Sequence, residues 1–298
     1  MVDSSPALAA APDLAVTCAQ VRGGNGRISV PLVLPGLRGA LRSDPADGGG
    51  GGDVYYLSIC GSGLLTRICL ADLCGHGERV ATLGREIHGL LQRYADRPDQ
   101  RRLLRDLNGA LLPIGMKAMT TAAVVTYYPP RRSFSFTYAG HPPGWYYCSR
   151  TDRWDRLEAD AADDDASAPA LVNGPLGIQE SIAFTRTTRR AAVGDRIVLV
   201  TDGVLETPDA SRTLFGDRRV SEALHDLRQS SPEALADGVL DAMATFRGAP
   251  GFDHDDVTLM AFEVTPPPRG PAIWQMLRNR LLRPIGLASA PAYGVPAT

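Results

Sequence analysis

The stretch from Asp53 to Gly77, DVYYLSICGSGLLTRICLADLCGHG, decides the fold. Two short apolar runs, 54–60 and 64–70, are joined by Gly-Ser-Gly, and glycine readily takes the positive φ of a tight turn. We therefore predict two paired strands. Apolar residues then recur at helical spacing through residues 80–94, and a second helical pattern covers 101–112. Helices thus follow strands.

The same grouping continues along the chain. Residues 120–148 carry the strand-like segments TTAAVVTYY, FSFTY and GWYYC, separated by Pro-Pro turns, which predict a meander. Further strands are expected at 197–201 and 257–264, and further helices at 221–227 and 232–246. Strands in runs and helices in runs favour an α+β layered sandwich over the βαβ alternation of a nucleotide-binding sheet.

The ends differ from the middle in composition. Residues 1–12, rich in Ala, Pro and Ser, predict a flexible segment, and 13–265 one folded domain. A Pro-rich linker is expected at 266–272. The tail 273–298 predicts a short amphipathic helix, whose fate stays open between packing on its own domain, docking on a partner and lying on an anionic membrane surface.

Composition limits the partners and the location. The formal charge is −2 without a continuous basic stripe, which argues against nucleic acid. No apolar stretch of membrane-spanning length and no secretion signal is visible, so we expect a cytoplasmic protein. Reduced thiols fit that location, because no CxxC pair occurs among the cysteines, Cys18, Cys60, Cys69, Cys74 and Cys148.

Aspartates recur where a predicted strand meets a turn. In isolation each is readily explained as a turn or cap residue. Their recurrence in one chain instead favours carboxylates that converge into a cation cage, because without a cation they would repel one another. Oxygen ligands favour Mg²⁺ or Mn²⁺, whereas no Cys or His pair has zinc spacing. The candidates are Asp53, Asp72, Asp202 and the pair Asp255 and Asp256.

Several segments together resemble one known family. GGDVYY, ADLCGHG, TYAGHPPG, GPLGI, GDRIVLVTDGVLET and DDVTLMAF, within residues 49–264, are similar to the bacterial SpoIIE-like branch of PPM-type serine/threonine phosphatases. The resemblance implies a four-layer αββα sandwich of two antiparallel sheets flanked by helices. It also implies two Mn²⁺ or Mg²⁺ ions at one edge of that sandwich.

The resemblance assigns roles to individual positions. Asp53 corresponds to the first acidic ligand, Asp72 to the aspartate that bridges both metals, and Leu73 to a backbone carbonyl ligand. Asp202 and Asp255 correspond to the two late ligands, and Asp255 is preferred to Asp256 because the first position of that motif binds metal. Asp72 and Asp202 are accordingly the expected catalytic residues.

Some positions depart from the family or stay open. Many relatives carry Asp at the position of Tyr56 and Ser or Thr at that of Cys74, so the hydrogen bonds around the ligands can differ. His76 is either a general acid or a turn residue, and His141 is expected to be structural. The residues give Asn108 and Lys117 no role.

The resemblance also implies an activity. We expect hydrolysis of phosphoserine or phosphothreonine on a signalling partner, such as an antagonist of an anti-sigma factor, by a water that two metals activate. A separate regulatory protein is expected to act through helices 78–112. Two alternatives remain: a non-catalytic partner-binding module with the same fold, and a hydrolase of small phosphoesters.

Overall fold

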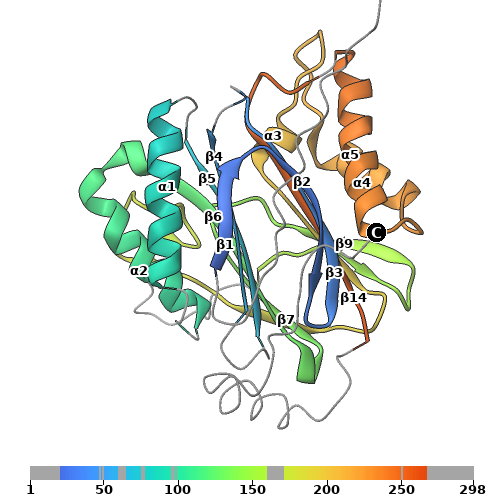
Figure 1. Ribbon diagram of the computed structural model, residues 1–298, viewed down its shortest axis with the longest axis horizontal. Coiled ribbons are helices and arrows are strands. Elements are labelled where there is room, and N and C mark those ends of the chain that lie inside the picture. Colours follow the sequence, from blue (N-terminus) through green and yellow to red (C-terminus); the bar gives the residue numbers. More distant parts are fainter. Residues whose placement is uncertain are drawn as a thin grey trace, which may run out of the picture.

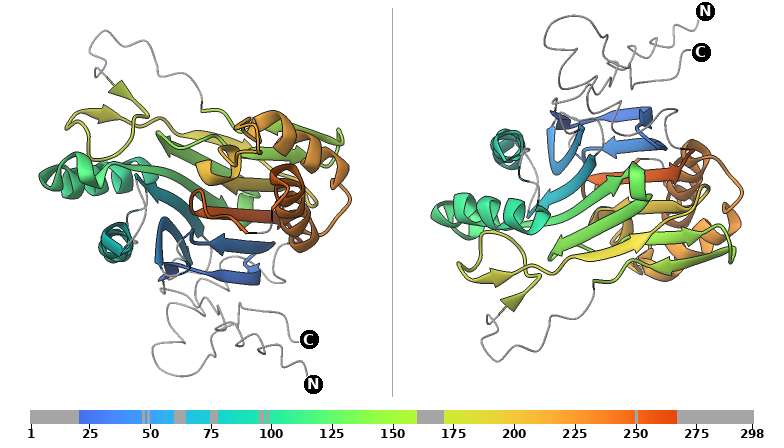
Figure 2. Two further views of the ribbon diagram at one scale, coloured as in Figure 1. Left: turned by 90° about the horizontal axis from the view of Figure 1, so that it is seen from above. Right: turned by 90° about the horizontal axis from the view of Figure 1, so that it is seen from below.

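Two antiparallel sheets stack face to face and helices cover both outer faces. The computed structural model describes residues 21–46, 48, 50–59, 65–74, 78–94, 97, 99–159, 171–249 and 251–266 of the 298-residue chain. Figure 1 shows α1 and α2 against one sheet and α4 and α5 against the other, and Figure 2 shows the same layers from above and below. The predicted α+β fold of four layers is confirmed.

The first sheet contains the two strands that open the sequence argument. Its six strands are antiparallel throughout and carry the order β1-β4-β5-β6-β7-β12. Strand β5 is buried along its whole length, because the second sheet covers one face and helices cover the other. The bounds are β1 Val21–Gly26, β4 Gly50–Ile59, β5 Thr66–Leu73, β6 Thr120–Tyr128, β7 Ser133–Ala139 and β12 Thr187–Arg190.

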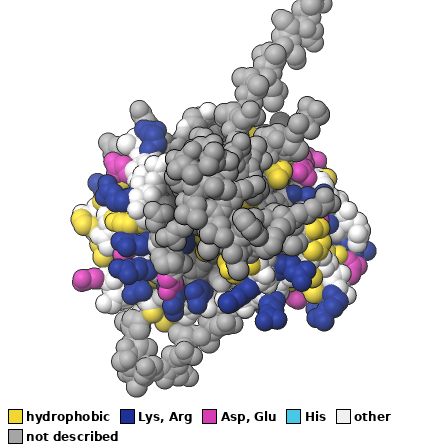
Figure 3. Space-filling view, turned by 60° about the horizontal axis from the view of Figure 1, so that its bottom comes forward, with side chains coloured by type: hydrophobic (Ala, Val, Ile, Leu, Met, Phe, Trp, Pro, Cys, Tyr) yellow, Lys and Arg dark blue, Asp and Glu magenta, His cyan; other side chains and the backbone are white. Residues whose placement is uncertain are grey.

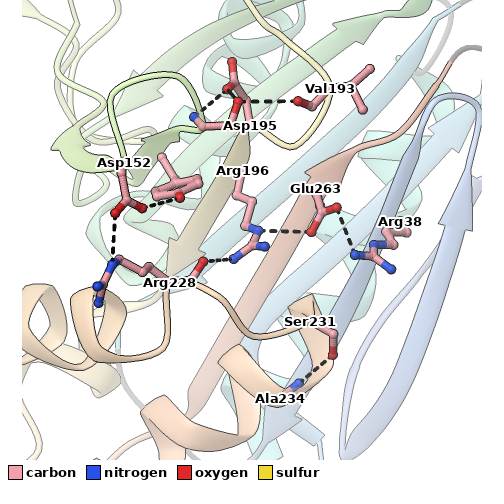
Figure 4. Close-up of polar contacts among 11 residues, drawn as sticks. Arg38, Asp152, Val193, Asp195, Arg196, Arg228, Ser231, Ala234 and Glu263 are labelled. Carbon is pink, nitrogen blue, oxygen red and sulfur yellow. Dashed lines mark hydrogen bonds and ion pairs between the residues drawn. The ribbon is translucent and has the colours of Figure 1, made fainter.

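The second sheet also has six antiparallel strands, in the order β2-β3-β14-β13-β8-β9. At one end of it, Glu263 accepts hydrogen bonds from Arg38 and Arg196 on the neighbouring strands, 2.9 and 3.0 Å long (Figure 4). The bounds are β2 Ile28–Leu34, β3 Leu37–Asp44, β8 Trp145–Cys148, β9 Arg153–Arg156, β13 Arg196–Val200 and β14 Val257–Val264.

Helices and short elements complete the layers. Helix α5 begins at a serine cap, where Ser231 Oγ accepts from the Ala234 amide at 3.3 Å (Figure 4), and ends at left-handed Gly248. A small parallel pair, β10 Leu171–Val172 and β11 Ile182–Ala183, stands apart from both sheets. The helices are α1 Glu78–Arg93, α2 Gln100–Leu111, α3 Asp202–Leu205, α4 Gly216–Asp226 and α5 Pro232–Arg247; the 3₁₀ turns are Leu112–Ile114, Met116–Ala118 and Pro129–Arg131.

Three clusters of buried apolar side chains lie between the four layers. One fills the space between the two sheets, the second lies between the first sheet and α1 with α2, and the third lies between the second sheet and α4 with α5. Burial on both faces of each sheet explains the apolar runs that the sequence shows. No helix among the described residues is long and apolar enough to cross a membrane.

The predicted meander at 120–148 is wrong for its last strand. Strands β6 and β7 pair in the first sheet, but β8 lies in the second, where it pairs with β13 and β9. Pro142 and Pro143 precede β8 and have no N–H to donate to a ladder, so the chain leaves one sheet here and enters the other.

Other expectations are met, shifted or left untested. The helix predicted at 221–227 begins earlier, at Gly216, and three strands form in residues 21–44, for which no strand was predicted. The Gly61–Gly63 turn, His76, segment 1–12 and the tail 273–298 lie outside the described residues.

Candidate metal centre

The aspartates singled out in the sequence lie at one end of the sandwich. In the first sheet, Val54 of β4 pairs with Ala71 of β5, so Asp53 and Asp72 adjoin that pair on neighbouring strands. In the second sheet, Val200 of β13 pairs with Leu259 of β14. Asp202 follows β13 as the first residue of α3, and Asp255 precedes β14. Each sheet thus supplies two carboxylates.

One threonine joins the two sheets at this end. Thr201 Oγ1 donates to Asp53 Oδ2 at 2.8 Å and accepts from the Thr258 amide at 2.9 Å. Thr201 is fully buried and Asp53 only 2% exposed, so water does not compete for this hydrogen bond. The Thr201 hydroxyl therefore holds the Asp53 carboxylate in a fixed place beside the second sheet.

The carboxylates are close enough to perturb one another. Burial, and then the charges of Asp202 and Asp255, raise the pKa of Asp72 to about 8. Burial, and then Asp72, raise the pKa of Asp53 well above its usual value. The pKa of Asp202 is raised by burial and next by Asp255. The structure therefore brings Asp53, Asp72, Asp202 and Asp255 together.

Asp256 has a different role from its neighbour. Its carboxylate accepts from the backbone amides of Ala46, at 2.9 Å, and of Gly52. The chain approaches so closely here that a Cβ on Gly51 would lie 2.3 Å from Asp256 Oδ2. Asp256 thus fastens the loop before β4 to the start of β14. These contacts favour Asp255 as the member of the pair that serves the cluster.

The donor set suits a hard cation. It consists of carboxylate oxygens in a largely buried place, where unneutralised charges repel and desolvation is costly. Among the described residues, no three Asp, Glu, His or Cys side chains already surround a single point at ligand distances. Asp72 and Asp202 instead share a hydrogen bond, which two carboxyl groups form when one holds a proton. Divalent cations can replace that proton and hold the oxygens together.

Comparison with known proteins identifies the family. The family model described as Stage II sporulation protein E (SpoIIE) matches residues 63–265, more than half of the chain. The chain belongs to the SpoIIE family. This result confirms the resemblance to the SpoIIE-like branch of PPM-type, or PP2C-type, phosphatases. No curated protein matches the chain in a sequence search.

Solved structures share the fold of this SpoIIE-family chain at low sequence identity. The RsbU and RsbW domains of Rv1364c from Mycobacterium tuberculosis match at 22% identity and a TM-score of 0.66, over 82% of this chain and 64% of that one. The SiaA-PP2C domain of Pseudomonas aeruginosa matches at 18% identity and a TM-score of 0.63, over 76% of this chain and 85% of that one. The PP2C phosphatase domain of SpoIIE from Bacillus subtilis, with a fragment of its regulatory domain, matches at 17% identity and a TM-score of 0.62. The match covers 84% of this chain and 64% of that one. This chain thus spans less than two thirds of the first and third structures.

The histidine of the TYAGHPPG motif is structural, as the sequence suggests. The His141 ring lies 2.8 Å from Thr121 Oγ1 and 3.1 Å from the Val200 carbonyl, and so links the two sheets. Burial lowers the pKa of His141 to about 4. The ring is therefore neutral near pH 7, donating to the carbonyl and accepting from the hydroxyl.

Two residues near the cluster were not singled out from the sequence. Glu206, one turn after Asp202, adds negative charge that raises the Asp202 pKa. His254 Nε2 lies 2.9 Å from the Gly203 carbonyl and 3.2 Å from Thr207 Oγ1, which ties the loop before β14 to α3. Both lie beside motif aspartates, but adjacency in sequence alone does not reveal these contacts.

The remaining expected site residue is a backbone ligand. Leu73 is buried at the end of β5, directly after Asp72, and pairs with Thr120 of β6. The adjoining Cys74 is exposed and its amide donates to the Met119 carbonyl at 3.1 Å. The 3₁₀ turn before β6 therefore supports the strand end that carries Asp72 and Leu73.

Proposed function

We propose that this chain is a metal-dependent phosphatase that hydrolyses phosphoserine or phosphothreonine on a protein. One observation carries the proposal: carboxylates from both sheets, buried in the first and half-buried in the second, meet at one end of the sandwich and raise one another's pKa. Such a cluster costs stability unless positive charge neutralises it, and clusters of this kind occur at functional sites. Membership in the SpoIIE family adds support.

The proposed metals are two Mg²⁺ or Mn²⁺ ions, held by Asp53, Asp72, Asp202 and Asp255 with the Leu73 carbonyl. A catalytic domain of the phosphatase PstP, solved with two manganese ions, shares the fold at 18% identity and a TM-score of 0.51. Two such ions, when bound, supply positive charge to phosphoryl oxygens and acidify water for in-line attack. The intact carboxylate set argues against a non-catalytic module.

The chain's own residues prepare the site. Asp72, contributed by the first sheet, and Asp202, contributed by the second, keep their carboxylates in contact with each other. Thr201 fixes Asp53, and the backbone bonds of Asp256 fix the loop that leads into β4. Because the donors are held before substrate arrives, little reorganisation is needed when a phosphate enters.

The proposed substrate is a phosphorylated bacterial signalling protein, such as an antagonist of an anti-sigma factor. Support comes from Rv1364c, whose matching structure contains an RsbU and an RsbW domain. Helices α1 and α2 cover the first sheet directly after Asp72, so a separate regulatory protein that binds them could move the strand end carrying that ligand. A cytoplasmic location fits such a partner.

The test compares Asp72→Asn and Asp202→Asn with Asp226→Asn, which removes an exposed carboxylate on α4. Turnover of a phosphoserine protein and of a small phosphoester is measured in Mn²⁺ and in chelator. Loss of an outer-shell partner of a metal costs about 10–100-fold, so loss of a ligand should cost at least that much. Asp226→Asn should keep full activity, and circular dichroism should show all variants folded.

The results of these assays distinguish the phosphoprotein phosphatase from the two alternative functions. Near wild-type, metal-dependent turnover by Asp72→Asn or Asp202→Asn would show that the cluster is not the active site. A preference for the small phosphoester would favour the alternative substrate class, and no metal-dependent turnover of either substrate by the unmodified chain would favour the non-catalytic module.

A further inference from the structure

A cavity lies at the opposite end of the sandwich from the carboxylates. Strands β5 and β6 show the separation: Asp72 pairs with Thr121, whereas Thr66, at the other end of β5, pairs with Tyr127. Beyond Tyr127 the chain turns at the bottom of Figure 1 and enters β7. The cavity has a volume of about 630 Å³ and lies among this turn, β12 and the β8–β9 hairpin.

Arginines surround this cavity. Arg132 comes from the turn before β7, Arg150 from the β8–β9 turn, and Arg189 and Arg190 from β12. Within the part of the chain that the structure describes, none of the four forms an ion pair with a carboxylate. With this end turned forward, Figure 3 shows Lys and Arg side chains in a band across the described surface. Four arginines against two carboxylates leave an excess of positive charge around the cavity, which favours an anionic ligand.

Of the two acidic side chains that line the cavity, Asp195 is held by donors other than the four arginines. Asp195, 3% exposed, accepts from the Ser149 amide at 2.8 Å, from the Ala192 amide at 2.7 Å and from the Tyr146 hydroxyl. Figure 4 shows its carboxylate directed at the β8–β9 turn. Asp155 lies 3.8 Å from Arg153, which is outside the cavity. Neither carboxylate is an ion-pair partner for the four arginines.

We propose that this cavity binds a small anion with at least two phosphate groups, of the size of a nucleoside diphosphate. Guanidinium groups recognise phosphate through paired N–H donors, and several of them suit more than one phosphate. The volume falls in the range of small-molecule pockets, well above the need of a single phosphate. Tyr146, Cys148 and Ala191 provide wall for a less polar part of the ligand.

The binding test uses the full chain in chelator, because the metal-free carboxylate cluster repels anions and cannot account for binding. Isothermal titration with ADP and with pyrophosphate should each show one saturable site, weakened by salt. Adenosine should not bind. No saturable binding of ADP or pyrophosphate, or equal binding of adenosine, would overturn the proposal.

Matched variants locate the site. Arg150→Gln with Arg190→Gln removes two exposed cavity charges, and Arg93→Gln with Arg102→Gln removes two exposed charges from α1 and α2. Because the first pair removes two charged hydrogen-bond donors, it should weaken ADP binding by at least about tenfold. The second pair should leave it unchanged. Equal affinity in both pairs would place the anion elsewhere.

A cysteine in the cavity wall gives an independent readout. Cys148 is partly exposed, and hydrogen bonding from Thr151 lowers the pKa of its thiol, which favours alkylation. Bound ADP should slow alkylation of Cys148 but not of exposed Cys74, as followed by peptide mass spectrometry. Unchanged alkylation of Cys148 at saturating ADP would contradict the assignment even if ADP binds.

Discussion

At the scale of single residues, the Thr201 hydroxyl holds one carboxylate of the candidate metal centre in place. It donates to Asp53 and accepts from the Thr258 amide, both within the buried part of the site. Thr201→Val keeps the shape but leaves both partners without this bond. We expect metal affinity and turnover to fall by about 10–100-fold, as for other groups that orient ligands. Turnover measured against Mn²⁺ concentration tests this.

A conservative substitution controls that experiment. Thr201→Ser retains the hydroxyl and should recover most of the lost metal affinity. If Thr201→Val bound metal as well as the unmodified chain, the hydroxyl would be needed only for stability, which urea unfolding measures separately.

His141 makes a prediction about pH and stability. Its pKa is about 4 in the fold and about 6.5 in an unfolded chain, so between these values the unfolded chain binds a proton that the folded chain does not. Stability from this site therefore falls as pH drops from about 6.5 to about 4, by roughly 2–3 kcal/mol. The raised carboxylate pKa values act in the opposite direction. The measurement is thus the difference in urea stability between the chain and His141→Gln across that range, and a constant difference would contradict it.

Sequence reasoning found the carboxylates but not their supports. Asp53, Asp72, Asp202 and Asp255 are recognisable because each adjoins an apolar strand. Asp256 accepts hydrogen bonds from the amides of Ala46 and Gly52, and Ala46 is 210 residues away in the chain. Nothing in the local pattern indicates such a contact.

At the scale of elements, several strands with apolar runs were predicted, but β2, ISVPLVL, was missed although it is apolar and alternates in burial, and strands with few apolar residues were missed as well. Strand β1, VRGGNG, is rich in glycine, and β3, LRGALRSD, carries charges at its exposed positions. Their pairing with β4 and β14 overrides weak local preference. The crossing before β8 was missed because a Pro-Pro pair marks a break without saying which sheet the chain enters next.

Asn108 shows how α2 is connected to the neighbouring loop. Its side chain, 3% exposed, donates to the Gln179 carbonyl at 2.8 Å and accepts from the Gly177 amide at 2.9 Å. The adjoining Leu176 bonds in turn with Thr120, beside the end of β5. Local sequence patterns could not assign Asn108 this role, because its partners are distant in the chain.

Asn108→Ala should therefore loosen this connection. Leaving a buried amide and carbonyl without partners costs about 1–3 kcal/mol, which urea unfolding will show. Hydrogen exchange at the Gly177 amide should become faster. Arg102→Gln, an exposed change on the same helix, should alter neither quantity. Unchanged exchange at Gly177 in Asn108→Ala would mean that the loop is held by other contacts.

At the scale of the whole molecule, the carboxylate cluster links metal binding to stability. Without cations the four aspartates repel one another, and two of them, Asp53 and Asp72, are buried from water. Mn²⁺ or Mg²⁺ at 100 times its dissociation constant should stabilise the fold by about 2.7 kcal/mol for each site filled, since the ions bind the folded state. A rise in melting temperature, reversed by chelator, measures this. Asp202→Asn should reduce the rise, and an equal rise in that variant would place the ions elsewhere.

The layered α+β class was predictable from the sequence pattern, whereas the order of the four layers was expected only from the resemblance to the SpoIIE-like branch. Continuous apolar runs in the sequence indicate strands that are buried on both faces. Apolar residues at helical spacing indicate helices with one buried face, which pack on the outside of a sheet. Neither pattern indicates that β12 is an edge strand of the first sheet or that β2 is an edge strand of the second. Those positions follow from how the strands pair across long separations.

The division of the carboxylates between β4 with β5 and β13 with β14 has a consequence for refolding. A folding intermediate in which only one sheet has formed contains only two of the four carboxylates. After dilution from denaturant, recovered turnover can appear no sooner than the moment at which the two halves dock. We therefore expect the proposed phosphatase activity to return only at the final step of assembly, so that its recovery reports when that step occurs.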